Sequence, residues 1–202
     1  MMEAGKSKQQ VVDFSKRAFE RKLFAGTSGN LSVYDREKDR IYITPSSVRY
    51  ETMQPADVMV IDLAGKVLEG PHKPSSEWRL HTAVYAVYPQ IGALVHTHSP
   101  FATAFAVNRE EIPATLIEMF FFLGGSIPCA PYACPGTAEV GAYAVPLLED
   151  KGGCLLANHG VLAVGKDMEQ AYIRAEYIED AAKIYSIAKL VGTPAILSAL
   201  EE

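Results

Sequence analysis

Two short apolar segments joined by a charged turn constrain the fold of this chain more than any other feature. Residues 31–34 alternate apolar and polar side chains, residues 40–44 do the same, and the five residues between them are all charged. This pattern predicts a β-hairpin and therefore antiparallel pairing. Further apolar strands are expected at residues 57–63, at 91–98 and, as two short strands or a hairpin, within 152–164.

Apolar side chains at helical spacing predict the remaining elements. Gly26 is expected to close the first helix, and a serine hydroxyl from Ser75 or Ser76 is expected to cap the second. Hairpins and helices without regular strand–helix alternation favour a sheet with helices packed against it. No break in composition suggests two domains, so one domain is expected over residues 1–202. The predicted helices cover residues 8–24, 78–88, 100–107 and 168–191.

Composition excludes several classes of protein. Apolar residues make up 49% of the 202 residues and charged residues 21%, as in a globular protein. A net charge of -5 without a basic stripe argues against a nucleic-acid partner. The longest apolar runs, such as residues 119–123, are too short to cross a membrane, and residues 1–10 lack the apolar core of a signal peptide.

The cysteines indicate the compartment. Cys129, Cys134 and Cys154 are an odd number without a metal-binding doublet, and we expect no bond between the first two. Reduced, mostly structural thiols are typical of the cytoplasm.

His96 and His98 are the most informative residues. Side chains two apart in a strand point to the same face, roughly 6.5–7 Å apart, so both rings can converge on one cation. A single histidine here would more often be a satisfied polar residue at a strand end. Two on one face of an apolar strand would each need a buried partner, which favours the ligand hypothesis.

A third imidazole, His159, lies between apolar residues and beside a glycine. Alone it could equally be a core histidine, but with the pair it completes three nitrogens and leaves a coordination position open. His72 lies in a Pro-rich loop and is expected to be solvated. His81 follows Glu77 by four residues in the predicted helix, so it could orient that carboxylate or simply pack.

Glu77 and three hydroxyl-rich turns leave alternatives open. The carboxylate could complement the helix dipole, or it could be a fourth metal ligand that becomes a proton shuttle. Residues 26–30, 44–47 and 74–76 are each ordinary turns, but together with a metal triad they suggest an anion site.

Six ordered segments between residues 26 and 160 together resemble the class II aldolase/adducin family, in particular its fuculose-1-phosphate aldolases and their relatives. The likeness implies one α/β domain with a central, mainly antiparallel sheet layered by helices. It also implies a homotetramer with active sites at subunit interfaces. The matching segments are residues 26–32, 43–46, 74–79, 96–98, 126–132 and 158–160.

The resemblance assigns roles to particular residues. His96, His98, His159 and Glu77 would hold Zn²⁺, with Mn²⁺ or Co²⁺ as alternatives, and Glu77 would also be the catalytic acid/base. The sugar phosphate would be held by Thr27, Gly29, Asn30, Ser46, Ser47, Ser75 and Ser76.

The implied reaction is a retro-aldol cleavage of a ketose 1-phosphate. The cation would stabilise the enediolate left when the carbon–carbon bond breaks, giving dihydroxyacetone phosphate and an aldehyde. Fuculose, rhamnulose, 5-deoxyribulose and methylthioribulose phosphates are the candidate substrates. No lysine falls in the motifs, so a Schiff-base route is not expected.

The chain departs from the family pattern at several positions. Ser47 replaces a glycine of the fuculose-phosphate enzymes, and Ile117 replaces an assisting tyrosine. With the sequence ending at Glu202, we expect the tail that carries a second assisting tyrosine to be absent. Glu118 lies in an apolar stretch and is either a second acid/base, as in methylthioribulose-phosphate dehydratases, or a surface acid.

Other functions of the same family remain alternatives. A 4-epimerase would use the same cleavage and rejoin the aldehyde, and decarboxylases and dehydratases share the metal site. The presence of Glu77 makes a dehydratase less expected. A non-catalytic module, as in adducin heads, would share the fold without the metal, and the three histidines argue against it.

Overall fold

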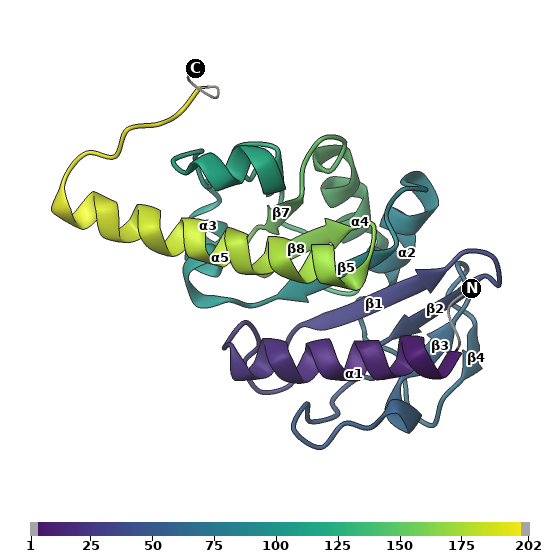
Figure 1. Cartoon of the computed structure of the whole chain (residues 1–202). Helices are drawn as coiled ribbons and strands as arrows, with labels where there is room; N and C mark the ends of the chain where they lie inside the picture. Colours follow the sequence, from purple (N-terminus) through teal and green to yellow (C-terminus); the bar gives the residue numbers. More distant parts are fainter. Residues whose placement is uncertain (1–3, 199–202) are drawn as a thin grey trace.

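One eight-stranded sheet forms the centre of the computed structural model, which describes residues 4–198 (Figure 1). Its strand order is β4-β3-β2-β1-β5-β8-β7-β6, and only the β6–β7 pair is parallel. The mainly antiparallel sheet is therefore confirmed. The expectations about a leader and a C-terminal tail concern residues that the structure does not describe. The same is true of the first and last residues of the predicted domain.

The predicted hairpin is confirmed, with Tyr34 opposite Ile41 and Ser32 opposite Ile43. The apolar segments at 57–63 and 91–98 form shorter strands than expected, and 152–164 forms the expected hairpin of two short strands. The strands are β1 (Asn30–Asp35), β2 (Arg40–Ile43), β3 (Met59–Ile61), β4 (Val67–Glu69), β5 (Ala93–Thr97), β6 (Cys129–Ala130), β7 (Gly153–Leu156) and β8 (Gly160–Gly165).

Helices cover both faces of the sheet. Side chains of α1, α3 and α5 form one buried cluster with one face, and those of α2 and α4 form a second cluster with the other. Figure 1 shows α1 and α5 crossing the front of the sheet. The helical elements are α1 (Ala4–Glu20), α2 (Trp78–Val87), α3 (Pro100–Asn108), α4 (Ala138–Ala144) and α5 (Met168–Val191), with short turns η1 (Pro55–Asp57), η2 (Met119–Leu123) and η3 (Val145–Leu147).

Strand alternation decides which polar residues face α2. In β5, Val95 packs in the cluster of α1, α3 and α5, whereas Leu94 packs in the cluster of α2 and α4. Side chains two apart share a face, so His96 lies on the α2 side with Leu94. Asn30 and Ser32 of β1 lie on that side as well, because Leu31 between them packs in the α1 cluster. Polar positions of both central strands therefore face one helix.

Two predicted helix signals were wrong. The first helix ends at Glu20, and Lys22 adopts a left-handed φ of 61° directly after it, so the chain turns before Gly26 is reached. At α2 the residue before the helix is Glu77, with no side-chain cap. The Ser75 hydroxyl instead accepts a hydrogen bond from the Glu77 amide at 3.3 Å, two positions too early to cap the helix.

None of the helices in the described part of the chain has the length and hydropathy needed to cross a membrane. Cys129, Cys134 and Cys154 are all free thiols, which agrees with the expectation that the first two do not pair.

Candidate metal centre

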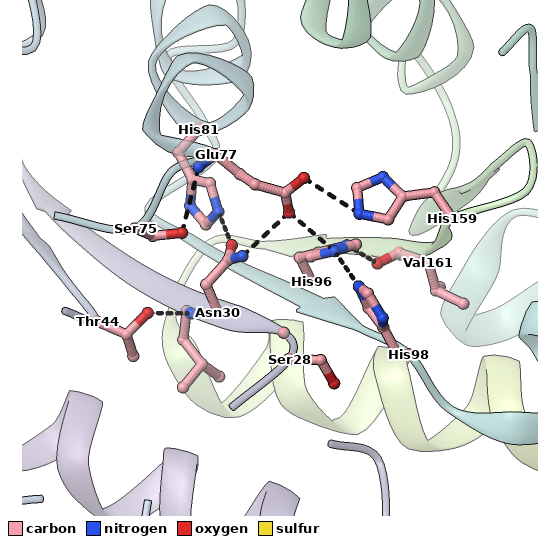
Figure 2. Close-up of polar contacts among 12 residues, drawn as sticks. Ser28, Asn30, Thr44, Ser75, Glu77, His81, His96, His98, His159 and Val161 are labelled. Carbon is pink, nitrogen blue, oxygen red and sulfur yellow. Dashed lines mark hydrogen bonds and ion pairs between the residues drawn. The ribbon is translucent and has the colours of Figure 1, made fainter. Parts of the chain in front are cut away.

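Three imidazoles from separate parts of the chain converge at one end of the sheet (Figure 2). His96 lies in β5, His98 follows that strand by one residue, and His159 lies in the turn between β7 and β8. One nitrogen of each ring lies within 4.8 Å of the others, and the Nε2 atoms of His96 and His98 are 3.0 Å apart. The structure therefore brings together the three histidines that sequence analysis singled out.

A tight turn holds His159 against the other two rings. Leu156 pairs with Gly160, so only three residues connect β7 to β8, and Asn158 among them adopts a left-handed φ of 55°. A Cβ atom at Gly160 would lie 2.3 Å from the Thr97 carbonyl oxygen and 3.3 Å from Cε1 of His96. Only glycine lets the turn approach β5 this closely.

A backbone contact orients the His96 ring. Its Nδ1 lies 2.8 Å from the Val161 carbonyl oxygen, which can only accept a hydrogen bond. Nδ1 therefore carries the proton, and in the neutral ring Nε2 presents a lone pair to the other imidazoles. An Nδ1 proton donated to a backbone carbonyl is the usual arrangement of a metal-binding histidine.

The Glu77 carboxylate completes the cluster. Its Oε2 lies 2.9 Å from His96 Nε2 and its Oε1 lies 3.1 Å from His159 Nε2, with the side chain only 7% exposed. Within residues 4–198, Oε1 has no hydrogen-bond partner. A buried carboxylate oxygen without a donor, facing imidazole nitrogens, fits a divalent cation bound by three nitrogens and one oxygen.

The electrostatics of the cluster are coupled. Burial would raise the pKa of Glu77, but His96, His159 and a hydrogen bond from Asn30 together hold this pKa well below its usual range. Burial would lower the pKa of His96, yet the Glu77 carboxylate raises it overall. Burial and the neighbouring His96 lower the pKa values of His98 and His159 to about 4. The last two rings are thus held neutral, as metal ligands must be.

A cavity of about 380 Å³ opens beside the histidines. Another cavity, of about 400 Å³, is lined by residues such as Phe120 and Arg174 and contains none of the predicted site residues. The first cavity is lined by all seven residues predicted to hold phosphate, and by three of the cluster: Thr27, Gly29, Asn30, Ser46, Ser47, Ser75, Ser76, Glu77, His98 and His159.

Two extended segments bring the serines together. Pro45 and Pro74 form an antiparallel bridge. The Ser46 amide donates to the Lys73 carbonyl at 2.9 Å, and the Ser75 amide donates to the Thr44 carbonyl at 3.0 Å. These two amides are already used by the fold, so an anion in the cavity would have to be bound by other amides and by hydroxyl groups.

Backbone conformation explains the residue types at two cavity positions. Gly29 has a φ of 82°, and a Cβ atom there would lie 2.9 Å from the His96 carbonyl oxygen. Ser47 also lies in the left-handed region, with a φ of 62°. A glycine adopts such a conformation without strain, whereas a serine does so at a cost.

Two other predicted positions lie elsewhere. Glu118 is exposed at the start of η2 and does not line the cavity. Its neighbour Ile117, which replaces the assisting tyrosine, is 58% exposed. His72, expected to be solvated, is partly exposed and its Nε2 lies 2.9 Å from Asp57 Oδ1, where the hydrogen bond lowers the pKa of that carboxyl.

Sequence reasoning missed part of the site. His81 contacts Asn30 and Ser32 of β1, and Ser32 contacts Tyr85. The four-residue spacing of Glu77, His81 and Tyr85 was visible in the sequence and indicates one helix face. What it did not reveal is which strand that face meets.

An antiparallel sheet layered by helices, with a histidine–carboxylate cluster beside a hydroxyl-lined cavity, defines a class II aldolase-type domain. The chain belongs to the family described as Class II Aldolase and Adducin N-terminal domain, which matches residues 9–186. The expected family, fold and enzyme class are thereby confirmed.

Individual relatives make the comparison more specific. The chain is 38% identical to a 5-deoxy-D-ribulose 1-phosphate aldolase of Bacillus thuringiensis serovar kurstaki, over 95% of this chain and 90% of that protein. It is 39% identical to an L-ribulose-5-phosphate 4-epimerase of Salmonella paratyphi C, over 91% and 86%. A solved L-fuculose 1-phosphate aldolase superposes with a TM-score of 0.90 at 39% identity, over 95% of this chain and 90% of that structure.

Proposed function

We propose that this chain cleaves a ketose 1-phosphate to dihydroxyacetone phosphate and an aldehyde with the help of a divalent cation. The observation that carries the proposal is the convergence of His96, His98 and His159 beside the buried Glu77 carboxylate, whose two oxygens lie 2.9 and 3.1 Å from imidazole nitrogens. The aldolases among its relatives are consistent with this chemistry.

Each part of the site has a distinct proposed task. The cation, when bound, supplies Lewis-acid stabilisation of the negative charge that develops on substrate oxygens. Glu77 is the proposed fourth ligand and the acid/base, because it is buried, ionised and next to the histidines. Glu77 would take up the proton that the substrate hydroxyl loses as the aldehyde forms, and would then deliver it to the carbon left by bond cleavage.

The phosphate is proposed to bind in the cavity beside the cluster. Thr27, Ser46, Ser47, Ser75 and Ser76 supply hydroxyl groups there, and Gly29 and Asn30 complete the set. The 5-deoxyribulose, fuculose and methylthioribulose 1-phosphates are the proposed substrates. Two relatives of this chain are aldolases named for the first two of these compounds.

Zinc is the proposed cation, with manganese or cobalt as substitutes, because three imidazoles and one carboxylate suit all of them. We also propose a homotetramer. Large exposed apolar side chains, including Phe121, Leu190 and Val191, support this by offering surface for subunit contacts. The proposed cytoplasmic location rests on the three free cysteines.

A coupled assay for dihydroxyacetone phosphate tests the proposal. The protein would be stripped of metal, reloaded with Zn²⁺, Mn²⁺ or Co²⁺, and offered the three ketose 1-phosphates in turn. Metal-dependent release with at least one of them is expected. No release with any substrate under any metal would reject the aldolase proposal.

The 4-epimerase is the second candidate, because a relative at 39% identity carries that name. An epimerase would cleave the same type of bond but rejoin the fragments. Conversion of L-ribulose 5-phosphate to its 4-epimer without release of dihydroxyacetone and glycolaldehyde phosphate, and without cleavage of the ketose 1-phosphates, would favour this activity over the aldolase.

A further inference from the structure

A ladder of polar side chains links α2 to β1 beside the candidate metal centre, and Figure 2 shows the part of it made by Glu77, Asn30 and His81. Glu77, His81 and Tyr85 are four residues apart and share one side of the helix, whereas Asn30 and Ser32 are two apart on the strand. Four helical residues rise about 6 Å and two strand residues rise about 6.8 Å, so the two repeats stay nearly in step. Side chains from the two elements therefore alternate along the ladder.

The contacts form one continuous chain. Tyr85 Oη lies 2.8 Å from Ser32 Oγ, which lies 2.6 Å from His81 Nδ1. His81 Nε2 hydrogen bonds with Oδ1 of Asn30. The Asn30 Nδ2 group then donates to Glu77 Oε2 at 3.1 Å.

Chemistry fixes the direction of every bond in this chain. An ionised carboxylate only accepts, so the Asn30 amide nitrogen must face Glu77 and the amide oxygen must face His81. His81 Nε2 therefore carries the proton, and Nδ1 accepts from the Ser32 hydroxyl. Tyr85 is left to donate, and its single hydroxyl proton is shared between Ser32 Oγ at 2.8 Å and the Ser32 carbonyl oxygen at 3.0 Å. All of the donors point toward the Glu77 carboxylate.

Burial makes this arrangement rigid. His81 and Ser32 are both fully buried, and Asn30 is 4% exposed. Burial and the neighbouring His96 lower the pKa of His81 to about 3, which keeps its ring neutral and leaves it one donor and one acceptor. A buried donor or acceptor without a partner is destabilising, so a rearrangement of these hydrogen bonds would be unfavourable.

The Asn30 amide is the group in this hydrogen-bond series whose orientation can be reversed by a simple rotation. Its two ends differ only in which atom donates, and rotation by 180° would exchange them. A flipped amide would turn its oxygen toward the carboxylate, and two acceptors repel. The His81 proton, held in place through Ser32, is what opposes this rotation. Glu77 Oε1 has no hydrogen bond among the described residues and faces His159 Nε2 at 3.1 Å, so the Asn30 amide supplies the hydrogen bond that ties the carboxylate to β1.

We propose that His81 is a positioning residue that fixes the orientation of the Asn30 amide and thereby holds the Glu77 carboxylate toward His96 and His159. This inference rests on the proposed function, because the orientation of the Glu77 carboxylate matters only if Glu77 binds a metal and transfers a proton. It adds to that function a role for a residue that lies outside the cavity lining.

The test compares two substitutions at position 81. His81→Phe keeps a ring of similar size but removes both polar atoms, whereas His81→Gln keeps an amide donor that can reach Asn30. Affinity for Co²⁺ would be measured in the metal-free proteins by competition with a chelator. His72→Phe is the matched control, because that histidine is partly exposed and pairs with Asp57 away from the cluster.

We expect His81→Phe to weaken Co²⁺ binding about 10–100-fold, the usual effect of removing a group that orients a ligand. His81→Gln should restore most of this affinity, and His72→Phe should bind as the unaltered protein does. In turnover assays His81→Phe should lower kcat by a larger factor than it raises KM, because Asn30 is the only one of the seven proposed phosphate-binding residues that His81 contacts.

Unaltered Co²⁺ affinity in folded His81→Phe would overturn the proposal, as would equal losses in the Phe and Gln variants. If His81→Phe does not fold, Ser32→Ala is the second test, because it removes the hydroxyl that holds the His81 tautomer. Unaltered Co²⁺ affinity in Ser32→Ala would then overturn the proposal. Absence of aldolase activity in the unaltered protein would reject the proposed function alone, because the Co²⁺ measurements need no substrate.

Discussion

His96 donates its Nδ1 proton to the Val161 carbonyl oxygen 2.8 Å away, and this contact decides which nitrogen of the ring faces His98 and His159. Val161 lies in β8, and His159 lies in the turn just before this strand, so one short segment both supplies a neighbouring imidazole and orients the His96 ring. The register of β5 and β8 is therefore as important for the cluster as the histidines themselves.

Replacement of the central ring should abolish metal retention. His96→Ala removes the nitrogen that lies closest to both Glu77 and His98, so only two imidazoles remain. After dialysis, elemental analysis should find near-stoichiometric metal in the unaltered protein and almost none in this variant. His72→Ala is the control, and stoichiometric metal in His96→Ala would contradict the ligand assignment.

Loss of the Glu77 charge should separate binding from turnover. Glu77→Gln leaves all three imidazoles in place, so metal should still be bound, but the amide cannot exchange the required proton. We expect kcat to fall about 10²–10⁴-fold, the usual contribution of general acid–base catalysis. Metal analysis and the dihydroxyacetone phosphate assay measure the two effects. Near-normal turnover would remove Glu77 from the acid/base role.

The metal-free protein should lose stability in mild acid. Burial lowers the pKa values of His98 and His159 to about 4 and that of His81 to about 3, while unfolded histidine titrates near 6.5. Between about pH 6.5 and 4 the unfolded chain therefore binds more protons than the folded one, so the free energy of unfolding falls as the pH falls. His96, whose pKa is raised, opposes this trend.

Urea unfolding at several pH values measures this dependence. The slope should become shallower in a His98→Asn, His159→Asn double variant, which lacks two of the depressed groups. A stability that is constant between pH 6.5 and 4.5 in the unaltered protein would contradict the pKa directions given above.

Ser47 should be replaceable by glycine with a gain in stability. Its φ of 62° is strained for serine, and glycine relieves that strain while giving up some chain entropy. Ser47→Gly should be about 1 kcal/mol more stable than Ser47→Ala, which keeps the Cβ atom. Both variants should raise KM for the phosphorylated substrate, because both lose the hydroxyl. A more stable alanine variant would contradict the strain argument.

Glu118 does not line the cavity beside the histidines of its own chain. It can therefore act in catalysis only at the corresponding cavity of another subunit. If it serves a neighbouring subunit, Glu118→Gln and Glu77→Gln should each be inactive alone. Mixed, unfolded and refolded together, they should recover part of the activity, because some sites then contain both carboxylates. If hetero-oligomers shown to contain both variants recover no activity, Glu118 is a surface acid without a catalytic role.

Much of the fold followed from local pattern. The hairpin of β1 and β2 and the helix α5 have strong periodicity over their whole length, and both were predicted close to their observed bounds. The strands β4 and β6 were not predicted, since they contain three and two residues and one is fully exposed. Their existence depends on pairing with distant strands rather than on their own sequence.

In the candidate site, too, local sequence patterns could be predicted and contacts between distant segments could not. The His96 and His98 pair was visible because alternation along one strand is a local property, and His159 followed from its neighbours. The link from Tyr85 through Ser32 to Asn30 was not visible, because it depends on which strand α2 faces. That choice is made by packing of the buried clusters on the two faces of the sheet.

Glu77 precedes the first turn of α2 instead of lying inside the helix, with φ and ψ of -98° and 14°. The Glu77 carbonyl oxygen accepts a hydrogen bond from the Leu80 amide at 2.9 Å, but a change in the side-chain torsions or in φ of Glu77 leaves the helical turns in place, whereas His81 lies within the helix. The carboxylate could thus withdraw to admit an incoming molecule and return afterwards while the helix behind it stays intact.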